Sequence, residues 1–314
     1  MSAHEQQEPL RRRVRAAALR GIVRTAGVLP PTALRTSLAA AAPLLLSRRQ
    51  RAVIAENARI AAPRLDELAA ACGLPPLPPP DALARACARF AAEQFTSWIR
   101  LARGAGPTDP QGEWVERAVS LDPTVERLDE VLALGRGAIV VTAHLGDWEL
   151  LCARLRRRGH EGAVVGRVRR KDSSHRWLTD MRRAYGVETI PQDAHPRAAM
   201  RVLSRGGVLG LLTDLRVKRL ASRPVPFLGA MAPTLTAPAA FARAWRAPLV
   251  PARCVRSDRG FTLSVEEPLF LRGDLGRHGA EEDLLRRQNE VFGRWIAESP
   301  EQWAWYVPRY GPGV

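Results

Sequence analysis

The chain has 314 residues, of which 46% are hydrophobic, so it can bury a substantial core and is not an intrinsically disordered protein. Its formal net charge of +16 suits an anionic partner, either an anionic membrane surface or an anionic substrate. Because Lys171 and Lys218 are the only lysines among 48 basic residues, and aromatic residues do not alternate with the basic runs, we expect no nucleic-acid partner.

Residues 1–60 are expected to form a basic, amphipathic helical segment that associates with a membrane. Arginines alternate there with apolar residues at helical spacing, and the prolines at 30 and 31 interrupt the pattern. Such a helix is typical of a membrane interface, although the same pattern fits a helix packed on the main domain with a solvated arginine face. The apolar run at 36–47 is short and contains Pro43, so we expect no membrane-spanning helix.

Residues 61–118 are expected to be a helical region. The proline-rich stretch at 75–80 is typical of a stiff connector, and residues 81–103 follow the pattern of a helix with Asp81 at its N-cap. The four cysteines of the chain are scattered and form no CxxC pair, so we expect reduced thiols and no structural zinc site.

From residue 119 to residue 314 the pattern becomes that of an α/β domain. Short apolar runs alternate with helical stretches and lie at 137–141, 163–165, 208–212, 248–255 and 261–265. This alternation is typical of βαβ units. We therefore predict a mostly parallel sheet flanked by helices, with an α-helical N-terminal extension.

The stretch VVTAHLGDWELL, at 140–151, contains the candidate chemistry. His144 follows a predicted buried strand, and open α/β sheets bind ligands at the carboxyl ends of their strands. A histidine there can take a proton from a hydroxyl near neutral pH, and it works better when a carboxylate holds its second nitrogen. We expect Gly146 to turn the chain into a helix capped by Asp147. The alternative interpretation is a structural histidine beside the start of a helix.

Patterns of other enzyme classes do not occur in the sequence. There is no GxSxG elbow, no GxxxxGK[ST] loop, no GxGxxG fingerprint and no HExxH pair. We therefore expect no metal site, and we expect histidine-based transfer to a hydroxyl or amine without a covalent enzyme intermediate.

The chain resembles the late acyltransferases of lipid A biosynthesis, the lauroyl and myristoyl transferases, and the related phosphatidylinositol mannoside acyltransferases. The resemblance covers about residues 50–312 in order. It rests on RAVIAENARI (51–60), ALGRGAIVVTAHLGDWELL (133–151), GRVRRKDSSHRWLTDMRRAYG (166–186), the region 207–251 with its Asp214 and FLG, and NEVFGRWIAESPEQWAWYVPRYGP (289–312).

This resemblance implies a fold similar to that of the glycerolipid acyltransferases. It also implies transfer of a fatty acyl chain from acyl-carrier protein or acyl-CoA to a hydroxyl of a lipid A-like glycolipid, with the thioester as co-substrate and no other cofactor. The expected location is the cytoplasmic face of the inner membrane, with peripheral or weakly anchored attachment. The alternatives are another acceptor, such as a mannoside, an ornithine lipid or a lysophospholipid, or a non-catalytic lipid-binding protein.

The resemblance also implies roles for individual residues. His144 would be the general base, and Glu149 matches the acid of the Hxxxx[DE] motif, while Asp214 ends a predicted strand. Either acid could orient His144, and the spacing does not decide between them. Backbone N–H groups near Gly146 or an arginine could stabilise the oxyanion.

Four arginines are candidates for binding a phosphate of the glycolipid or of the donor's prosthetic arm, because arginine binds such groups bidentately. They are Arg167, Arg170, Arg182 and Arg216. The alternative is that they are solvated surface residues in an arginine-rich chain. The aromatic cluster of Trp303, Trp305 and Tyr306 is expected to pack or to anchor the protein at an interface.

Overall fold

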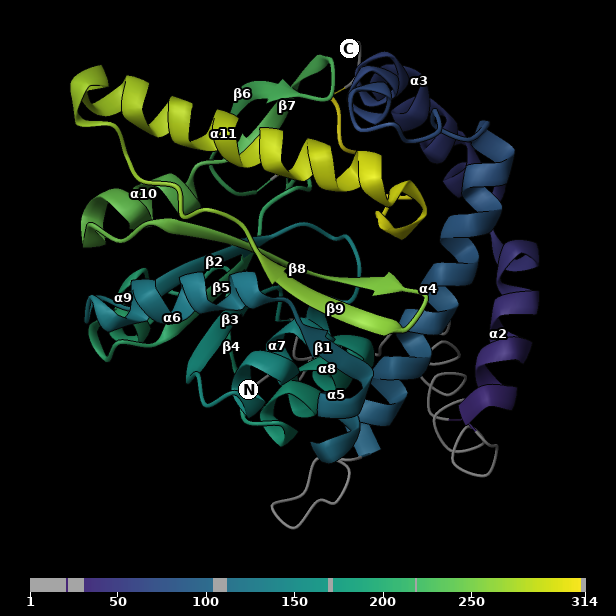
Figure 1. Ribbon diagram of the computed structural model, residues 1–314, viewed down its shortest axis with the longest axis horizontal. Coiled ribbons are helices and arrows are strands. Elements are labelled where there is room, and N and C mark those ends of the chain that lie inside the picture. Colours follow the sequence, from purple (N-terminus) through teal and green to yellow (C-terminus); the bar gives the residue numbers. More distant parts are fainter. Residues whose placement is uncertain (1–20, 22–30, 104–111, 169–171, 218, 312–314) are drawn as a thin grey trace, which may run out of the picture.

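A seven-stranded sheet lies at the centre of the computed structural model, which describes residues 21, 31–103, 112–168, 172–217 and 219–311 (Figure 1). The strand order is β1-β9-β8-β2-β5-β3-β4, and β8 and β9 pair antiparallel while the other neighbours pair in parallel. The strands are β1 (Val119–Leu121), β2 (Ala138–Thr142), β3 (Gly162–Gly166), β4 (Glu188–Pro191), β5 (Val208–Leu212), β8 (Leu249–Ser257) and β9 (Gly260–Val265). The predicted α/β fold with a mostly parallel sheet is confirmed.

Strand β2 is buried along its whole length, because the sheet is covered on both faces. Successive side chains of a strand point to opposite faces. Ile139 and Val141 accordingly pack into one hydrophobic core, and Ala138 and Val140 pack into the other. A strand packed on both sides has little freedom to move, so the loop that follows it is held on a rigid support.

Helices and one hairpin cover the two faces of the sheet (Figure 1). On one face lie α5 (Gly112–Ala118), α6 (Glu126–Ala133), α7 (Trp148–Arg157) and α8 (Ser173–Ala184). On the other lie α9 (Arg197–Ser204), α10 (Ala237–Trp245), α11 (Gly276–Glu298) and the antiparallel hairpin of β6 (Ser222–Phe227) and β7 (Ala230–Leu235). Short 3-10 turns at Pro123–Val125, Gly273–Leu275 and Pro300–Gln302 connect these elements.

The N-terminal helical region packs against this sheet domain. It contains α2 (Pro31–Leu45), α3 (Arg48–Ala71) and α4 (Pro80–Arg103). Helix α3 begins at a Ser47 capping box and runs through residue 60 without a break. Ile54 of α3 and Leu83 of α4 are fully buried in the core. Helix α4 starts at Pro80, so the expectation that Asp81 is its N-cap was wrong, because proline suits the first helical turn and Asp81 follows it.

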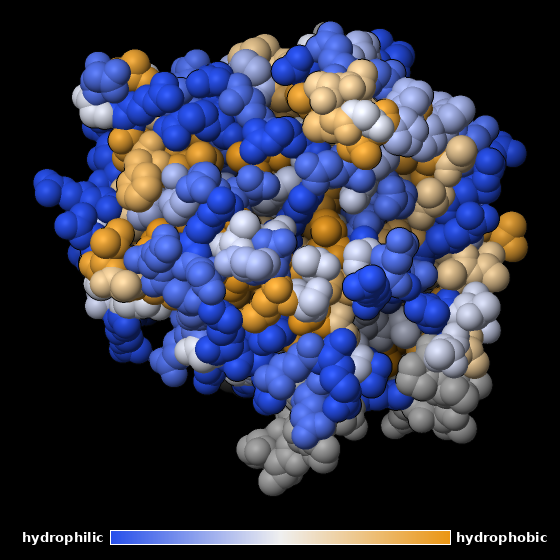
Figure 2. Space-filling view, viewed as in Figure 1, coloured by the Kyte–Doolittle hydropathy of each residue, from blue (hydrophilic) through white to orange (hydrophobic). Residues whose placement is uncertain are grey.

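No described helix is both long and apolar enough to cross a membrane. Apart from Gly21, the arginine-rich stretch before residue 31 lies outside the described residues. Hydrophilic residues dominate the face seen in Figure 2, with apolar residues in small groups between them. Leu44 and Leu45, at the end of α2, are 83% and 79% exposed and stand out among the large apolar side chains.

Candidate active site

The loop between β2 and α7 is fixed by a glycine and a helix cap. Gly146 has a φ of 66°, and a Cβ there would lie 2.1 Å from the carbonyl oxygen of Cys254, so only glycine fits. The next residue, Asp147, is the N-cap of α7 and accepts hydrogen bonds from the backbone N–H groups of Glu149 and Leu150. The expected turn and cap are confirmed, and together they fix the position of His144 at the end of β2.

His144 is paired with Asp214, which follows the neighbouring strand β5. The imidazole Nδ1 lies 2.7 Å from Oδ1 of Asp214, and the backbone N–H of His144 donates to Oδ2 at 2.9 Å. Strands β2 and β5 run parallel and adjacent, so their carboxyl ends bring together two residues that are 70 positions apart. The His144 side chain is 27% exposed, whereas Asp214 is fully buried.

The surroundings of Asp214 favour its ionised form. Burial by itself raises the pKa of this carboxyl, but the His144 ring, its backbone N–H and the Trp303 indole outweigh burial and lower the pKa below its ordinary value. Trp303 donates to Oδ2 at 2.7 Å. Because an ionised carboxylate only accepts hydrogen bonds, Nδ1 of His144 donates to Asp214, and in the neutral imidazole Nε2 is then an acceptor for a substrate.

Glu149 has different partners, although it lies only five residues after His144. Its carboxylate is fully buried and accepts hydrogen bonds from Nε of Arg182, shared between its two oxygens at 3.0 and 3.1 Å, from Nη2 of Arg182 at 2.5 Å, and from the Tyr185 hydroxyl at 2.6 Å. Burial by itself lowers the pKa of Arg182, but Glu149 outweighs it and raises the pKa. The structure thus brings Asp214, and not Glu149, to the imidazole.

A cavity of about 660 Å³ opens beside the exposed edge of His144. Its apolar lining includes Trp98, Trp148, Leu178, Leu212 and Leu215. Its basic lining comprises Arg167, His175, Arg182, Arg216 and Arg219, and the described residues that line it include no acid. The cavity therefore has room for an apolar chain and a positive potential for an anionic group.

The predicted phosphate-binding arginines differ in their availability. Arg167 is exposed and Arg216 half-buried on the cavity wall, so both guanidinium groups can reach a ligand. Arg182 also lines the cavity, but it is only 7% exposed and is engaged by Glu149. Arg170 lies outside the described residues.

The backbone N–H groups expected to stabilise an oxyanion near Gly146 already donate to other carbonyl oxygens. The N–H of Gly146 donates to the carbonyl oxygen of Gln302 at 3.1 Å, and the N–H of Asp147 donates to that of Cys254 at 2.7 Å. The expectation that backbone N–H groups near Gly146 stabilise an oxyanion was therefore wrong for these two groups, because the neighbouring chain segments already use them. The arginines of the cavity wall remain as candidate donors.

A third buried carboxylate lies in the same loop. Asp147 accepts a hydrogen bond from Nε1 of Trp98 at 2.9 Å through Oδ1, while Oδ2 has no hydrogen-bond partner. Burial raises the pKa of Asp147 to about 7, against the lowering effect of the Trp98 and backbone hydrogen bonds. Asp147 therefore acts as a helix cap and not as a partner of His144.

Several residues around the site were not predicted from the sequence. Gln94 donates to the carbonyl oxygen of Gly146 at 2.7 Å, and Trp98 and His175 line the cavity. Trp303 was expected to pack or to anchor the chain, yet its indole also contacts Asp214. These residues come from distant segments and belong to no local motif. For Gln94 and Trp98, the apolar periodicity of α4 was the available sequence signal that they face the core.

Metal chemistry finds no support among the described residues. They contain no group of three or more His, Cys, Asp or Glu side chains arranged to hold a metal ion. Cys87 and Cys254 are buried free thiols, and Cys72 and Cys152 are also unpaired.

Comparisons with known proteins show which family the chain belongs to. Residues 111–311 match the model of the bacterial lipid A biosynthesis acyltransferase family. The chain is 25% identical over 248 residues to a phosphatidylinositol mannoside acyltransferase of Mycobacterium tuberculosis (strain ATCC 25618 / H37Rv), which covers 77% of this chain and 75% of that protein. It is also 25% identical over 251 residues to a phosphatidylinositol mannoside acyltransferase of Mycolicibacterium smegmatis, which covers 77% of each.

Proposed function

The chain belongs to the bacterial lipid A biosynthesis acyltransferase family, and we propose that it is an O-acyltransferase that moves a fatty acyl chain from a thioester donor to a hydroxyl of a glycolipid. The observation that carries this proposal is the contact between His144 and Asp214 at the wall of a basic cavity. The imidazole is oriented to act as a base, and the adjacent cavity has room for an acyl chain and an anionic group. These features fit acyl transfer from an acyl-carrier protein or acyl-CoA.

In the proposed mechanism His144 is the general base. Its Nε2 accepts the proton of the acceptor hydroxyl while the hydroxyl oxygen attacks the thioester carbonyl carbon. Asp214 holds Nδ1–H and stabilises the imidazolium that forms, as the acid of a Ser-His-Asp triad does. No covalent acyl-enzyme is needed, because the acceptor hydroxyl itself is the nucleophile.

Collapse of the tetrahedral intermediate completes the transfer. The carbon–sulfur bond breaks, the ester forms, and the imidazolium returns its proton to the departing thiolate, so the products are an ester and a thiol. The negative oxygen of the intermediate needs donors, and the arginines of the cavity wall can supply them. Arg167 and Arg216 also suit a phosphate of the acceptor or of the donor's prosthetic arm.

Two acceptors are candidates. The family description favours a lipid A-like glycolipid, and the names of the mycobacterial relatives favour a phosphatidylinositol mannoside. Both combine sugar hydroxyls with phosphate, which fits a cavity whose described charged lining is basic. We place the lipid A-like acceptor first because the family model matches most of the α/β domain.

The proposed location is the cytoplasmic face of the inner membrane, with peripheral attachment to an anionic surface. Leu44 and Leu45 project from the end of α2, and Arg48 and Arg49 follow them at the start of α3. Exposed apolar side chains beside arginines suit the boundary between acyl chains and anionic headgroups. In flotation assays with anionic vesicles, Leu44→Glu should bind less than Leu134→Glu, the same change at a 60% exposed leucine just after α6. Equal binding of the two variants would contradict this attachment.

Lipid profiling of cells tests the proposed activity. Deletion should remove one acyl chain from one glycolipid, and the wild-type gene and a His278→Ala control should restore it, because His278 is an exposed residue of α11 outside the cavity. His144→Ala should fail to restore it. Restoration by His144→Ala would show that His144 is not the base and would favour a lipid-binding role.

The same samples identify the acceptor. A lipid A-like species or a mannoside that loses one chain is recognised by its mass and its headgroup fragments. With the purified acceptor, acyl-carrier-protein and acyl-CoA donors can then be compared directly, and transfer from neither thioester would overturn the proposed reaction.

A further inference from the structure

A short C-terminal segment lies directly against the loop that carries His144. The segment at 302–304 runs antiparallel to the loop, with a bridge between Leu145 and Trp303. The N–H of Ala304 donates to the carbonyl oxygen of His144 at 2.9 Å, and the N–H of Gly146 donates to that of Gln302 at 3.1 Å. The loop is therefore joined to this segment by an isolated antiparallel β-bridge, and its backbone cannot shift without breaking these bonds.

The same segment also holds the side chain of Asp214. Nε1 of Trp303 donates to Oδ2 at 2.7 Å, and the His144 backbone N–H donates to the same oxygen. These two donors fix Oδ2 and leave Oδ1 to meet the imidazole. Trp303 thus contacts Asp214 through its indole, while its two neighbours, Gln302 and Ala304, hydrogen-bond to the loop that carries His144.

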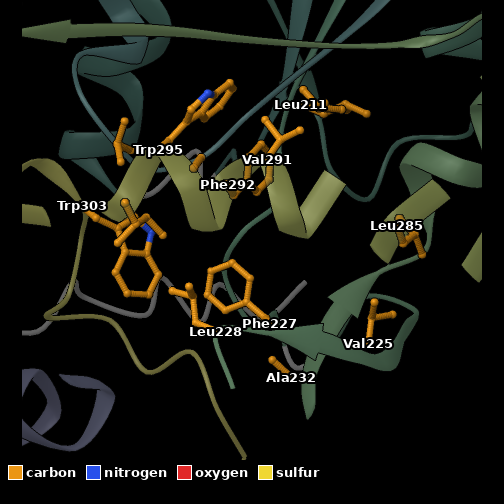
Figure 3. Close-up of a cluster of buried hydrophobic side chains, with 14 of the residues drawn as sticks. Leu211, Val225, Phe227, Leu228, Ala232, Leu285, Val291, Phe292, Trp295 and Trp303 are labelled. Carbon is orange, nitrogen blue, oxygen red and sulfur yellow. The ribbon is translucent and has the colours of Figure 1, made fainter. Parts of the chain in front are cut away.

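The position of the Trp303 ring is set by tight packing. The residue is 1% exposed, and its ring lies 5.9 Å from that of Phe227 and 4.6 Å from that of Trp305. Figure 3 shows Trp303 beside Phe227 and Leu228, in the buried cluster that the hairpin forms with α11. A ring confined in this way presents its N–H in one direction only.

Further contacts clamp the segment from both sides. The Gln302 side-chain amide exchanges two hydrogen bonds with the backbone of Arg256 in β8, at 2.8 and 3.1 Å. On the other side, Asn57 of α3 donates to the carbonyl oxygens of Trp305 and Val307, at 2.8 and 2.9 Å. The segment is therefore tied both to the central sheet and to the N-terminal helical region.

We propose that Trp303 is a positioning residue for the acyl transfer, whose indole N–H holds the Asp214 carboxylate in the orientation and ionised state that His144 needs. This proposal rests on the proposed function of the His144–Asp214 dyad. The segment at 302–304 would then contribute to catalysis, although its aromatic residues alone do not indicate such a role.

The indole hydrogen bond has a predictable effect on proton binding. It stabilises the unprotonated carboxylate, in agreement with the lowered pKa of Asp214. Without this hydrogen bond the His144–Asp214 pair should bind an additional proton more tightly. A larger fraction of the enzyme should then be in the protonated, inactive form at a given acidic pH. A change of one pKa unit corresponds to the energy of one ordinary buried hydrogen bond, so the expected shift is about one pH unit.

The experiment compares Trp303→Phe with Trp305→Phe. Trp305 is a matched control, because it is fully buried in the same segment and its Nε1 donates to the carbonyl oxygen of Pro300 at 2.6 Å. Both variants lose one buried indole hydrogen bond, but only Trp303→Phe loses a donor to Asp214. The measurements are kcat and KM for acyl transfer and the pH dependence of kcat/KM.

Trp303→Phe should lower kcat by roughly 10-fold to 100-fold with little change in KM, and it should move the acidic limb of the profile about one unit upward. Trp305→Phe should leave the acidic limb at its wild-type position. Identical acidic limbs in the two variants, or a loss confined to KM, would overturn the proposal.

Two further variants separate a folding defect from a loss of the hydrogen bond and separate this proposal from the proposed function. If Trp303→Phe does not fold, replacing Trp303 by 3-benzothienylalanine removes the N–H and keeps the shape of the ring, and the same shift is expected. His144→Ala separates the two proposals: activity in this variant would remove the proposed base, whereas an inactive His144→Ala with an unshifted Trp303 variant would remove only the role of Trp303.

Discussion

Asp214 and Glu149 are both fully buried beside the loop after β2, but they face different partners. Asp214 holds an imidazole that is 27% exposed and lines the cavity. Glu149 holds Arg182 and Tyr185, and these two side chains tie α7 to α8. The first carboxylate therefore supports a group that a substrate can reach, whereas the second closes an ion pair within the fold.

This difference shows that nearness in sequence does not assign a catalytic partner. Glu149 lies five residues from His144 and Asp214 lies 70 residues away, yet Asp214 makes the contact. Helix α7 begins after the turn at Gly146 and directs Glu149 toward α8. We expect substitutions of Asp214 to act mainly on rate and substitutions of Glu149 to act mainly on stability.

The largest effect is expected for Asp214→Asn. The amide cannot accept the Nδ1 proton in the same orientation or stabilise the imidazolium, so kcat should fall by roughly 10²-fold to 10⁴-fold. Asn keeps an oxygen that can accept from Trp303, so the protein should remain folded. Acyl-transfer kinetics and the near-UV circular dichroism spectrum check both expectations. A variant with nearly full kcat would contradict the role of Asp214 as the partner of the catalytic base.

Glu149→Gln should act in the opposite way. It leaves the buried Arg182 guanidinium without its counter-charge, which is expected to cost about 3–5 kcal/mol of unfolding free energy. The double variant Glu149→Gln/Arg182→Gln should recover part of this loss, because no unpaired charge then remains buried. Urea unfolding of the two single variants and the double variant measures the coupling, and simple additivity would show that the ion pair does not stabilise the fold.

A smaller loss is expected for Tyr185→Phe. The variant removes one hydrogen bond to the charged Glu149, which should lower the unfolding free energy by about 1.5–3 kcal/mol. Tyr310→Phe is the comparison, because its hydroxyl donates over a longer distance, 3.4 Å, to the uncharged carbonyl of Phe227. Unfolding free energies that fall equally in both variants would contradict a special role for the Glu149 cluster.

The smallest effect is expected for Asp147→Asn, and it depends on pH. The folded state raises the pKa of Asp147 to about 7 from 3.8, so it binds this proton more tightly than the unfolded state does. Wild-type stability should accordingly fall as the pH rises from about 4 to 7, by roughly 1–3 kcal/mol, and Asn should remove this dependence while still capping α7. Unfolding curves at pH 5 and pH 8 test this, and parallel changes in both proteins would show that Asp147 does not titrate in this range.

Much of the fold could be predicted from apolar periodicity. Each of the five predicted apolar runs overlaps a strand of the sheet. Strands β1 and β4 were not predicted, because they have only three and four residues and carry polar side chains. The hairpin of β6 and β7 was also missed, because its prolines obscure an alternating pattern.

The candidate site was predicted only in part. The turn at Gly146, the cap at Asp147 and the place of His144 at a strand end follow from local pattern, since a backbone turn and a helix cap depend on neighbouring residues. The closeness of Asp214 was proposed from its place at another strand end, but the choice between the two acids needed the packing of α7 against α8. The burial of Arg182 was not expected, because its own segment reads as a basic surface helix.

By itself the sequence determined the alternation of strands and helices and the residue types available for acyl transfer, because these depend on local spacing and composition. Only the tertiary structure decided which carboxylate meets the imidazole and which arginines face the cavity. It also brought Trp303 to Asp214 across 89 positions. Such contacts depend on the order of strands in the sheet and on the packing of distant segments, and neither is encoded in the spacing of residues within one segment.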